Sequence, residues 1–402
     1  MSKQKNKSYS SEGVFLTTEG EVQAPASKRI PAIVGIFIFF LAVGLLNLYS
    51  ASLGEKYFSA QLYRMAPGLI LFVFCGWLLP IRVIQSYSYW IYGITVGSLL
   101  VVLLLGYSAG GSQRWINLGF FAVQPSELAK ISVAIVVAKF FQSSRLNTAY
   151  QLKDLWPVML TTGLIFALIF KQPDLGTAGI CLIIAVTQIL FMKIDLRSVS
   201  IVGCSAIIVA ALGWNFFLHD YQKLRILNLL NPDLDPHGSG YNSIQSLVAI
   251  GSGNFVGKGF LQGTQAQLQF LPARHTDFIF SVFAEEWGFW AGTIVFFLFG
   301  LLTYLILEVA RHAQSTFSSL LAIGIAALIF VEFTINVAMV LGMFPVVGMP
   351  LPFFSYGGSS LLTMCIAMGI LVAIDRQTAS AKRMGGHDEL SLTGLSFRRR
   401  NH

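Results

Sequence analysis

IPAIVGIFIFFLAVGLLNLY, residues 30–49, is a run of 20 residues without a single charge. A helix needs about 20 apolar residues to cross the hydrocarbon core of a bilayer. Similar runs recur along the 402 residues, of which 55% are hydrophobic and 11% are charged. A soluble domain carries about 25% charged residues. The composition therefore predicts an all-α polytopic membrane protein rather than a soluble enzyme with one anchor.

Ten apolar segments are each near the length of one membrane span, so about ten transmembrane helices are expected. A large extracytoplasmic loop, residues 219–276, is expected between the seventh and eighth spans. Several segments are short, which predicts tilted or partly inserted helices. The expected spans are Ile30–Tyr49, Arg64–Leu79, Tyr89–Tyr107, Ser126–Phe141, Trp156–Phe170, Ala178–Met192, Val199–Leu218, Phe289–Val309, Phe317–Leu341 and Phe353–Ile374.

Charge placement predicts the orientation of the membrane domain, residues 30–376. Most of the 27 Lys and Arg residues fall on one side when both chain ends are cytoplasmic, and cytoplasmic loops are enriched in these residues. The polar stretch 1–29 is expected to be a disordered cytoplasmic tail with no signal-peptide pattern, and 377–402 a basic cytoplasmic tail. The net charge of +8 lies mainly in these tails and in short loops. No nucleic-acid partner is therefore expected.

The four cysteines lie in apolar stretches at unrelated spacings, which is typical of small core residues rather than disulfides or metal ligands. They are Cys75, Cys181, Cys204 and Cys365.

Four unusual polar stretches fall in odd-numbered connections between the expected spans. Because odd-numbered connections share one face of the membrane, these stretches are expected to meet in one extracytoplasmic site. They are residues 111–130, 172–177, the segment around 271–280, and 345–360.

Asp277 is the most informative of these polar residues. It lies in LPARHTDFIF, residues 271–280, where a long polar loop runs back into an apolar stretch. A carboxylate at this depth is costly and marks a functional site by default. Partial burial would raise its pKa toward the working pH of a general base, whereas neighbouring Arg274 would lower it. His275 and Thr276 lie between Arg274 and Asp277 in the sequence.

Charged residues before and within the fourth expected span suggest a substrate groove. Glu127 and Lys130 are spaced i, i+3, so they share a helix face and can form an ion pair. This pair either holds helices together or lines the groove. Arg114 either binds a phosphate through charge-assisted hydrogen bonds or keeps its charge at the interface.

Residues before the sixth and tenth spans have similar alternatives. Asp174 in QPDLGT is expected to cap a helix, or to line the site. The proline- and glycine-rich stretch 345–360 breaks the helical pattern at membrane depth, which is tolerated where backbone is buried in protein or lines a cavity. Its hydroxyls and flexible backbone would suit an anion, although a purely structural re-entrant turn is the alternative. The residues concerned are Ser355, Gly357, Gly358 and Ser359.

The sequence contains no nucleotide-binding signature such as GxxxxGK[ST] or a Rossmann fingerprint. The energy for a reaction must then come from the substrate itself. On the outer membrane face, a sugar linked to a lipid diphosphate is an activated substrate of this kind.

The four stretches, in this order, resemble the shape, elongation, division and sporulation (SEDS) family, and its RodA-like rather than FtsW-like members. The resemblance covers nearly the whole chain except its tails. The matching sequences are GSQRWINLGFFAVQPSELAK (111–130), KQPDLGT (171–177), DPHGSGYNSIQSLVAIGSGNFVGKGFLQGTQAQLQFLPARHTDFIF (235–280) and FPVVGMPLPFFSYGGSSL (344–361).

The resemblance implies a peptidoglycan glycosyltransferase that polymerises glycan strands from lipid II, for cell elongation and cell shape, in the bacterial cytoplasmic membrane. It implies that Asp277 is catalytic and that Glu127 and Lys130 belong to the site. The implied partners are undecaprenyl-diphosphate-linked glycan, membrane lipid and a class B penicillin-binding protein, a transpeptidase. No metal ligand set is predicted. A divalent cation, Mg²⁺ or Mn²⁺, is the cofactor left open, and the family pattern often has acidic residues where this chain has Gln269 and Ala273.

Two other functions remain open at this point. A multi-span protein with broken helices and buried charges could flip lipid II, although the sequence shows no clear internal repeat of the kind many transporters have. It could also be a non-catalytic scaffold of the cell-wall machinery.

Overall fold

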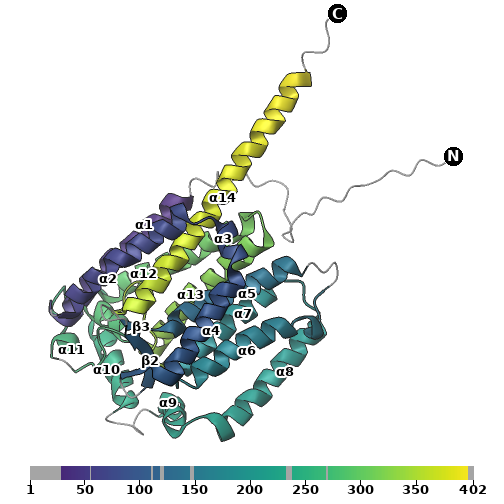
Figure 1. The fold of residues 1–402 in the computed structure, drawn as a ribbon. Helices are drawn as coiled ribbons and strands as arrows, with labels where there is room; N and C mark the ends of the chain where they lie inside the picture. Colours follow the sequence, from purple (N-terminus) through teal and green to yellow (C-terminus); the bar gives the residue numbers. More distant parts are fainter. Residues whose placement is uncertain are drawn as a thin grey trace, which may run out of the picture.

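The structure, a computed structural model, describes residues 29–54, 56–109, 112–117, 122–144, 149–231, 238–268 and 270–396. It is a bundle of helices with one small sheet at one end (Figure 1). The predicted all-α polytopic membrane fold is confirmed. The tail before Arg29, the run Arg398–Arg400 and Gln269 lie outside these ranges, so the expectations for them stay predictions.

A helix lies at each of the ten places where a span was expected. These helices are α1 (Arg29–Ser52), α2 (Lys56–Val73, continued by the π-helix Phe74–Leu78), α4 (Ser88–Leu105), α5 (Pro125–Ser143), α6 (Trp156–Phe170), α7 (Leu175–Leu190), α8 (Leu196–Leu212, continued by the π-helix Gly213–Phe217), α12 (Ile279–His312), α13 (Thr316–Val340) and α14 (Gly358–Ser396).

Six of these helices are long and apolar enough to cross a membrane. They contain the segments Arg29–Ser52, Tyr57–Leu78, Ser88–Leu105, Ile279–His312, Thr316–Val340 and Gly358–Ser380. The helices α6 and α7 are apolar but shorter. A total of ten spans therefore stays a prediction.

Short elements complete the fold between these helices. They are α3 (Ile81–Ser86), β1 (Tyr107–Ala109), β2 (Ser112–Asn117), β3 (Ala122–Val123), a 3₁₀ turn (Leu152–Asp154), α9 (Asp220–Leu230), α10 (Ser239–Ser252) and α11 (Thr264–Gln267). The strands form an antiparallel sheet in the order β1-β2-β3.

The helices α13 and α14 form the centre of the bundle. In each of them 78% of the most apolar window is buried, against 22% for α2 and α4. Stacked phenylalanines fill the space between the central helices and their neighbours: the Phe299 ring lies 4.2 Å from Phe40 and 4.1 Å from Phe333 between centroids. Outer helices instead expose apolar side chains such as Leu104 and Leu105, as expected of surface that faces lipid tails.

Three cysteines are buried as predicted, but Cys204 is exposed. The prediction was wrong for Cys204 because α8 lies at the edge of the bundle (Figure 1). An apolar helix at such an edge places part of its surface against lipid, so its small residues need not be in the core.

The long helix α12 is broken at Gly288, whose backbone has φ 75° and ψ −172°. The chain before α11 satisfies the backbone groups that the break frees: the N–H of Lys258 donates to the carbonyl of Glu285 at 3.0 Å, and Phe289 N–H donates to the carbonyl of Asn254 at 2.9 Å. The expected span began at Phe289, directly after this break. The first part of α12, which follows Asp277, is therefore an extra segment held by the large loop.

The first and last helices meet at one end of the bundle. Arg29, the first residue of α1, pairs with Asp375 of α14 at 3.7 Å between Nη1 and Oδ1. The start of α14 lies a full span away, at the end where β2, β3 and α9 gather (Figure 1). Most of the polar motifs belong to this second end.

Candidate active site

A cavity of about 720 Å³ opens among these elements, and all four predicted polar stretches line it. Its walls include residues from β2, the starts of α5, α7 and α14, the helix α9, and the irregular segment between α13 and α14. The predicted convergence of the four stretches is confirmed. A single cavity thus collects charges that are far apart in the sequence.

Asp277 lies in the wall of this cavity, just before α12. Its backbone is fixed by Asn336 of α13, whose Nδ2 donates to the carbonyls of Asp277 at 2.8 Å and Met349 at 2.6 Å. A Cβ atom on Gly348 would lie only 3.4 Å from the Asp277 carboxylate, so the chain passes close to it. The Asp277 side chain is therefore held between α13 and the backbone of the segment around Gly348.

The environment of Asp277 suits a general base. Burial raises the pKa of its carboxyl from 3.8 to about 6, and this outweighs the opposing effects of Arg225 and a hydrogen bond from Thr276. Burial thus dominates, and the opposing cation is Arg225 on α9 rather than the sequence neighbour Arg274. A carboxyl with a pKa of about 6 is mostly ionised at neutral pH and still basic enough to accept a proton efficiently.

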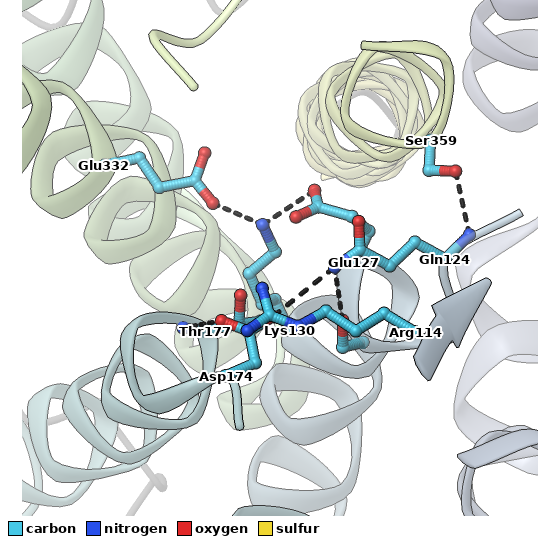
Figure 2. Close-up of polar contacts among 9 residues, drawn as sticks. Arg114, Gln124, Glu127, Lys130, Asp174, Thr177, Glu332 and Ser359 are labelled. Atoms are coloured by element: carbon cyan, nitrogen blue, oxygen red, sulfur yellow. Dashed lines mark hydrogen bonds and ion pairs between the residues drawn. The ribbon is translucent and has the colours of Figure 1, made fainter. Parts of the chain in front are cut away.

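Lys130 lies between two carboxylates in the cavity wall (Figure 2). Its Nζ is 2.7 Å from Oε2 of Glu127 and 2.5 Å from Oε1 of Glu332. The Glu127–Lys130 pair was predicted from its spacing and is confirmed. All three side chains are at most 6% exposed, so the ion pairs are shielded from water.

Sequence reasoning missed Glu332, although one signal was available. It is a carboxylate in the middle of the apolar stretch Phe317–Leu341, and charged residues at this depth are rare and functional by default. Its partner Lys130 lies on another helix, so no local spacing could identify the pair.

Arg114 links the sheet to the start of α7 (Figure 2). Its Nη1 lies 3.6 Å from Oδ2 of Asp174, and its guanidinium donates to the carbonyls of Gln172, at 3.0 Å, and Pro173. Asp174 also caps α7 by accepting a hydrogen bond from the N–H of Thr177 at 3.3 Å. The predicted cap is confirmed, and both charged side chains line the cavity.

The N-terminal ends of α5, α7 and α14 lie at the cavity, which is lined by residues at or beside the start of each helix, namely Gln124 and Glu127, Leu175, and Gly357 and Ser359. Ser359 joins two of them, because its Oγ accepts a hydrogen bond from the N–H of Gln124 at 2.9 Å. A helix N-terminus carries about half a positive charge. These termini favour an anionic ligand, whereas the charges of Arg114 and Lys130 are offset by the carboxylates with which they pair.

Not every predicted site residue reaches the cavity. Six of the ten predicted binding residues line it, namely Arg114, Glu127, Lys130, Asp174, Gly357 and Ser359. The other four are not among the residues that line it. Arg274 donates to the carbonyl of Ala51 at 2.7 Å, His275 stacks on Tyr57 at 4.1 Å, Ser355 donates to the carbonyl of Thr276 at 2.6 Å, and Gly358 packs beside Arg64.

Three of these four residues fix the segment that carries Asp277: Arg274 and His275 belong to it and contact Ala51 and Tyr57, and Ser355 donates to the carbonyl of its Thr276. The environment of His275 also differs from that of Asp277: burial and the adjacent Arg274 lower its pKa, which favours the neutral imidazole. Their position is typical of a supporting shell rather than of direct ligand contacts.

The described residues contain no ready-made ligand cluster for a divalent cation. Within these ranges, no three His, Cys, Asp or Glu side chains group closely enough to hold a metal ion. The carboxylates of Glu127 and Glu332 already share the Lys130 ammonium, which occupies the place between them.

Comparison with known proteins gives a consistent result. Residues 30–380 match the FtsW, RodA and SpoVE family model, described as "Cell cycle protein". The peptidoglycan glycosyltransferase MrdB of Escherichia coli K12 is 39% identical over 357 residues, which covers 86% of this chain and 92% of MrdB. Stage V sporulation protein E of Bacillus subtilis is 33% identical and covers 86% of this chain and 96% of its own length.

Solved structures show the same likeness. A chain from a peptidoglycan synthase complex, studied for the structural coordination of polymerization and crosslinking, has a TM-score of 0.74 and 29% identity, covering 86% of this chain and 97% of its own. The rod shape determining protein RodA of Thermus thermophilus has a TM-score of 0.63 and 26% identity, covering 86% of this chain and 96% of its own.

Proposed function

Because this chain belongs to the FtsW, RodA and SpoVE family of cell cycle proteins, we infer that it is a peptidoglycan glycosyltransferase of cell elongation. We propose that its substrate is lipid II and that the reaction takes place in the cavity around Asp277. The observation that carries this proposal is the placement of Asp277, whose pKa is raised by burial, in the wall of a cavity that also holds three cationic side chains.

The proposed reaction is an inverting glycosyl transfer. A sugar hydroxyl of the incoming lipid II attacks the anomeric carbon of the growing strand and forms the new C–O bond. The bond from that carbon to the diphosphate breaks, and its electron pair leaves with undecaprenyl diphosphate. The proton of the hydroxyl passes to the Asp277 carboxylate. One base is enough for this single displacement, whereas a retaining enzyme needs a second carboxylate as nucleophile.

The other charged residues would stabilise the leaving group. The diphosphate gains negative charge as the glycosidic bond breaks, and fixed cations and helix N-termini stabilise charge that develops in a site shielded from water. Arg114 and the N-termini of α5, α7 and α14 lie in the same cavity wall for this task. Lys130 is already paired with Glu127 and Glu332, so its main role would be to keep that wall ordered.

The proposed partner is a class B penicillin-binding protein that cross-links the strands as they form. The likeness to a chain of a complex that coordinates polymerization and crosslinking supports it. We also propose that the cavity opens on the extracytoplasmic side and that both chain ends are cytoplasmic. Two features support this orientation: Arg29 and Asp375 meet a full span away from the cavity, and the polar tails hold much of the basic charge.

One assay separates the proposed enzyme from its alternatives. The purified protein, with its transpeptidase partner, is incubated with labelled lipid II, and the products are separated by size. We expect glycan strands. If the protein in liposomes moves lipid II across the bilayer without forming polymer, it is a flippase. If it forms no polymer and moves no lipid II, it is a scaffold. Either result would overturn the proposal.

A further inference from the structure

Arg225 is a cavity residue that the proposed mechanism has not yet used. It lies on α9, in the large loop, and lines the cavity with Tyr221, Gln222 and Ile226 of the same helix. Asp277 reaches the same cavity from a different part of the chain, the start of α12. The helix α9 thus brings a cation to the cavity that holds the proposed base.

The other two cavity cations are already engaged by carboxylates. Arg114 pairs with Asp174, and Lys130 pairs with Glu127 and Glu332. The guanidinium of Arg225 instead lies 5.7 Å from the centre of the Tyr221 ring. In the part of the chain that the structure describes, no carboxylate lies within ion-pair distance of it. Arg225 is therefore the cavity cation most available to an incoming anion.

Given the proposed function, we propose that Arg225 binds the diphosphate of the substrate and, by doing so, makes Asp277 a stronger base only when substrate is present. In the empty cavity Arg225 favours the ionised form of Asp277 and weakens it as a base. A diphosphate that pairs with Arg225 neutralises this effect and adds its own negative charge beside the carboxylate. Both changes strengthen the affinity of Asp277 for a proton.

Other charged groups line the same cavity and bear on Asp277. They are Arg114 on β2, Glu127 and Lys130 on α5, Asp174 before α7, and Glu332 on α13, with the phenols of Tyr221 and Tyr356. Apart from the phenols, these groups pair with one another: Arg114 pairs with Asp174, and the single ammonium of Lys130 is shared by Glu127 and Glu332. Arg225 lowers the pKa of Asp277, and a bound anion that pairs with Arg225 would cancel this effect.

The consequence is measurable in the pH dependence of glycan synthesis. The acidic limb of kcat/KM reports the free enzyme, and the acidic limb of kcat reports the enzyme with bound substrate. We expect the limb of kcat to lie at higher pH than that of kcat/KM. In Arg225→Gln the limb of kcat/KM should move up by about one pH unit, because the opposing cation is gone from the free enzyme.

Two variants separate this role from a structural one. Arg225→Lys keeps the charge and should keep the limb of kcat/KM near its wild-type position. Lys223→Gln removes the same charge from the same helix at a residue that does not line the cavity, and it should leave both limbs unchanged. A loss of folding in Arg225→Gln would lower activity at every pH and would not move a limb.

The experiment measures both profiles for the full chain with its transpeptidase partner, using labelled lipid II, and measures binding of undecaprenyl diphosphate to the same variants. The expected results are a raised limb and at least tenfold weaker diphosphate binding in Arg225→Gln only. Unchanged limbs and unchanged binding in Arg225→Gln would overturn the proposal while leaving Asp277 as the base. Failure of the proposed function would give a different result: Asp277→Asn, which lacks the carboxylate, would keep wild-type activity.

Discussion

Lys130 of α5 and Glu332 of α13 are joined by an ion pair of 2.5 Å between Nζ and Oε1, and each side chain is 1% exposed. A second carboxylate, Glu127, lies 2.7 Å from the same ammonium. The group ties two central helices together at the wall of the cavity. A charge left unpaired in such a place is strongly destabilising.

Removal of the ammonium is therefore expected to destabilise the protein by about 3–5 kcal/mol, because Lys130→Met leaves two buried carboxylates without their cation. Thermal unfolding in detergent measures this effect. The double variant Lys130→Met with Glu332→Gln should recover part of the loss, since one charge is removed with its partner. Lys139→Met, a substitution in the same helix at a half-buried position, is the control. An unfolding temperature for Lys130→Met equal to that of this control would contradict the role of the group.

The cap of α7 gives a second prediction. Asp174→Ala removes the acceptor for Thr177 N–H and the partner of Arg114, which should cost about 1 kcal/mol of stability and reduce glycan synthesis at least tenfold. Ser315→Ala is a matched control. It removes a similar cap, which accepts from Ser318 N–H at 3.1 Å at the start of α13. The two variants should lose similar stability, but only Asp174→Ala should lose activity. Equal activity in both would show that Asp174 is a cap and nothing more.

The break in α12 gives a third prediction. Gly288 has φ 75°, and a Cβ atom there would lie 2.3 Å from the backbone nitrogen of Gly257. Gly288→Ala therefore combines a strained backbone, worth about 1–3 kcal/mol, with a clash between the added Cβ atom and the main chain of Gly257. Gly292→Ala, one turn later, meets nothing closer than 3.7 Å and should be tolerated. Limited proteolysis of the large loop compares the two variants, and faster cleavage is expected only in Gly288→Ala. Identical cleavage would mean that the loop does not hold the break.

The raised pKa of Asp277 predicts opposite effects on stability and activity. The folded state holds a carboxyl whose pKa is about 6, above its ordinary value of 3.8, so ionisation of Asp277 above pH 6 costs stability. Asp277→Asn should therefore raise the unfolding temperature at pH 7.5, and the gain should shrink as the pH falls through 6 toward 4. Unfolding curves at these pH values test this. A lower unfolding temperature for the variant at pH 7.5 would mean that the carboxylate is stabilised where it lies.

The sequence predicted the class of fold and the place of each long helix, because a span needs a long apolar run and such runs are local. It also predicted contacts between near neighbours, such as the Glu127–Lys130 pair and the Asp174 cap. It could not predict Glu332 as the partner of Lys130, or Arg225 as the cation near Asp277. Those relationships depend on how separate helices pack, which no local spacing records. Arg274 was favoured as that cation because it is close to Asp277 in sequence.

The break at Gly288 is a second feature that depends on contacts between distant parts of the chain. The apolar pattern of the expected span began at Phe289, so the boundary was visible. The ordered segment Ile279–Trp287 before it could not be separated from the loop by sequence, because the carbonyls at its end, those of Glu285 and Glu286, accept hydrogen bonds from Lys258 and Gly259 far earlier in the chain.

The role of Asp277 as the general base is tested by the rate at which Asp277→Asn polymerises labelled lipid II, measured with the transpeptidase partner. The variant keeps the shape of the side chain and removes the base, so we expect glycan synthesis to fall at least a hundredfold, within the range that general base catalysis contributes. Asp220→Asn, on the exposed start of α9, is the control and should polymerise at the wild-type rate. A wild-type rate in Asp277→Asn would contradict the account.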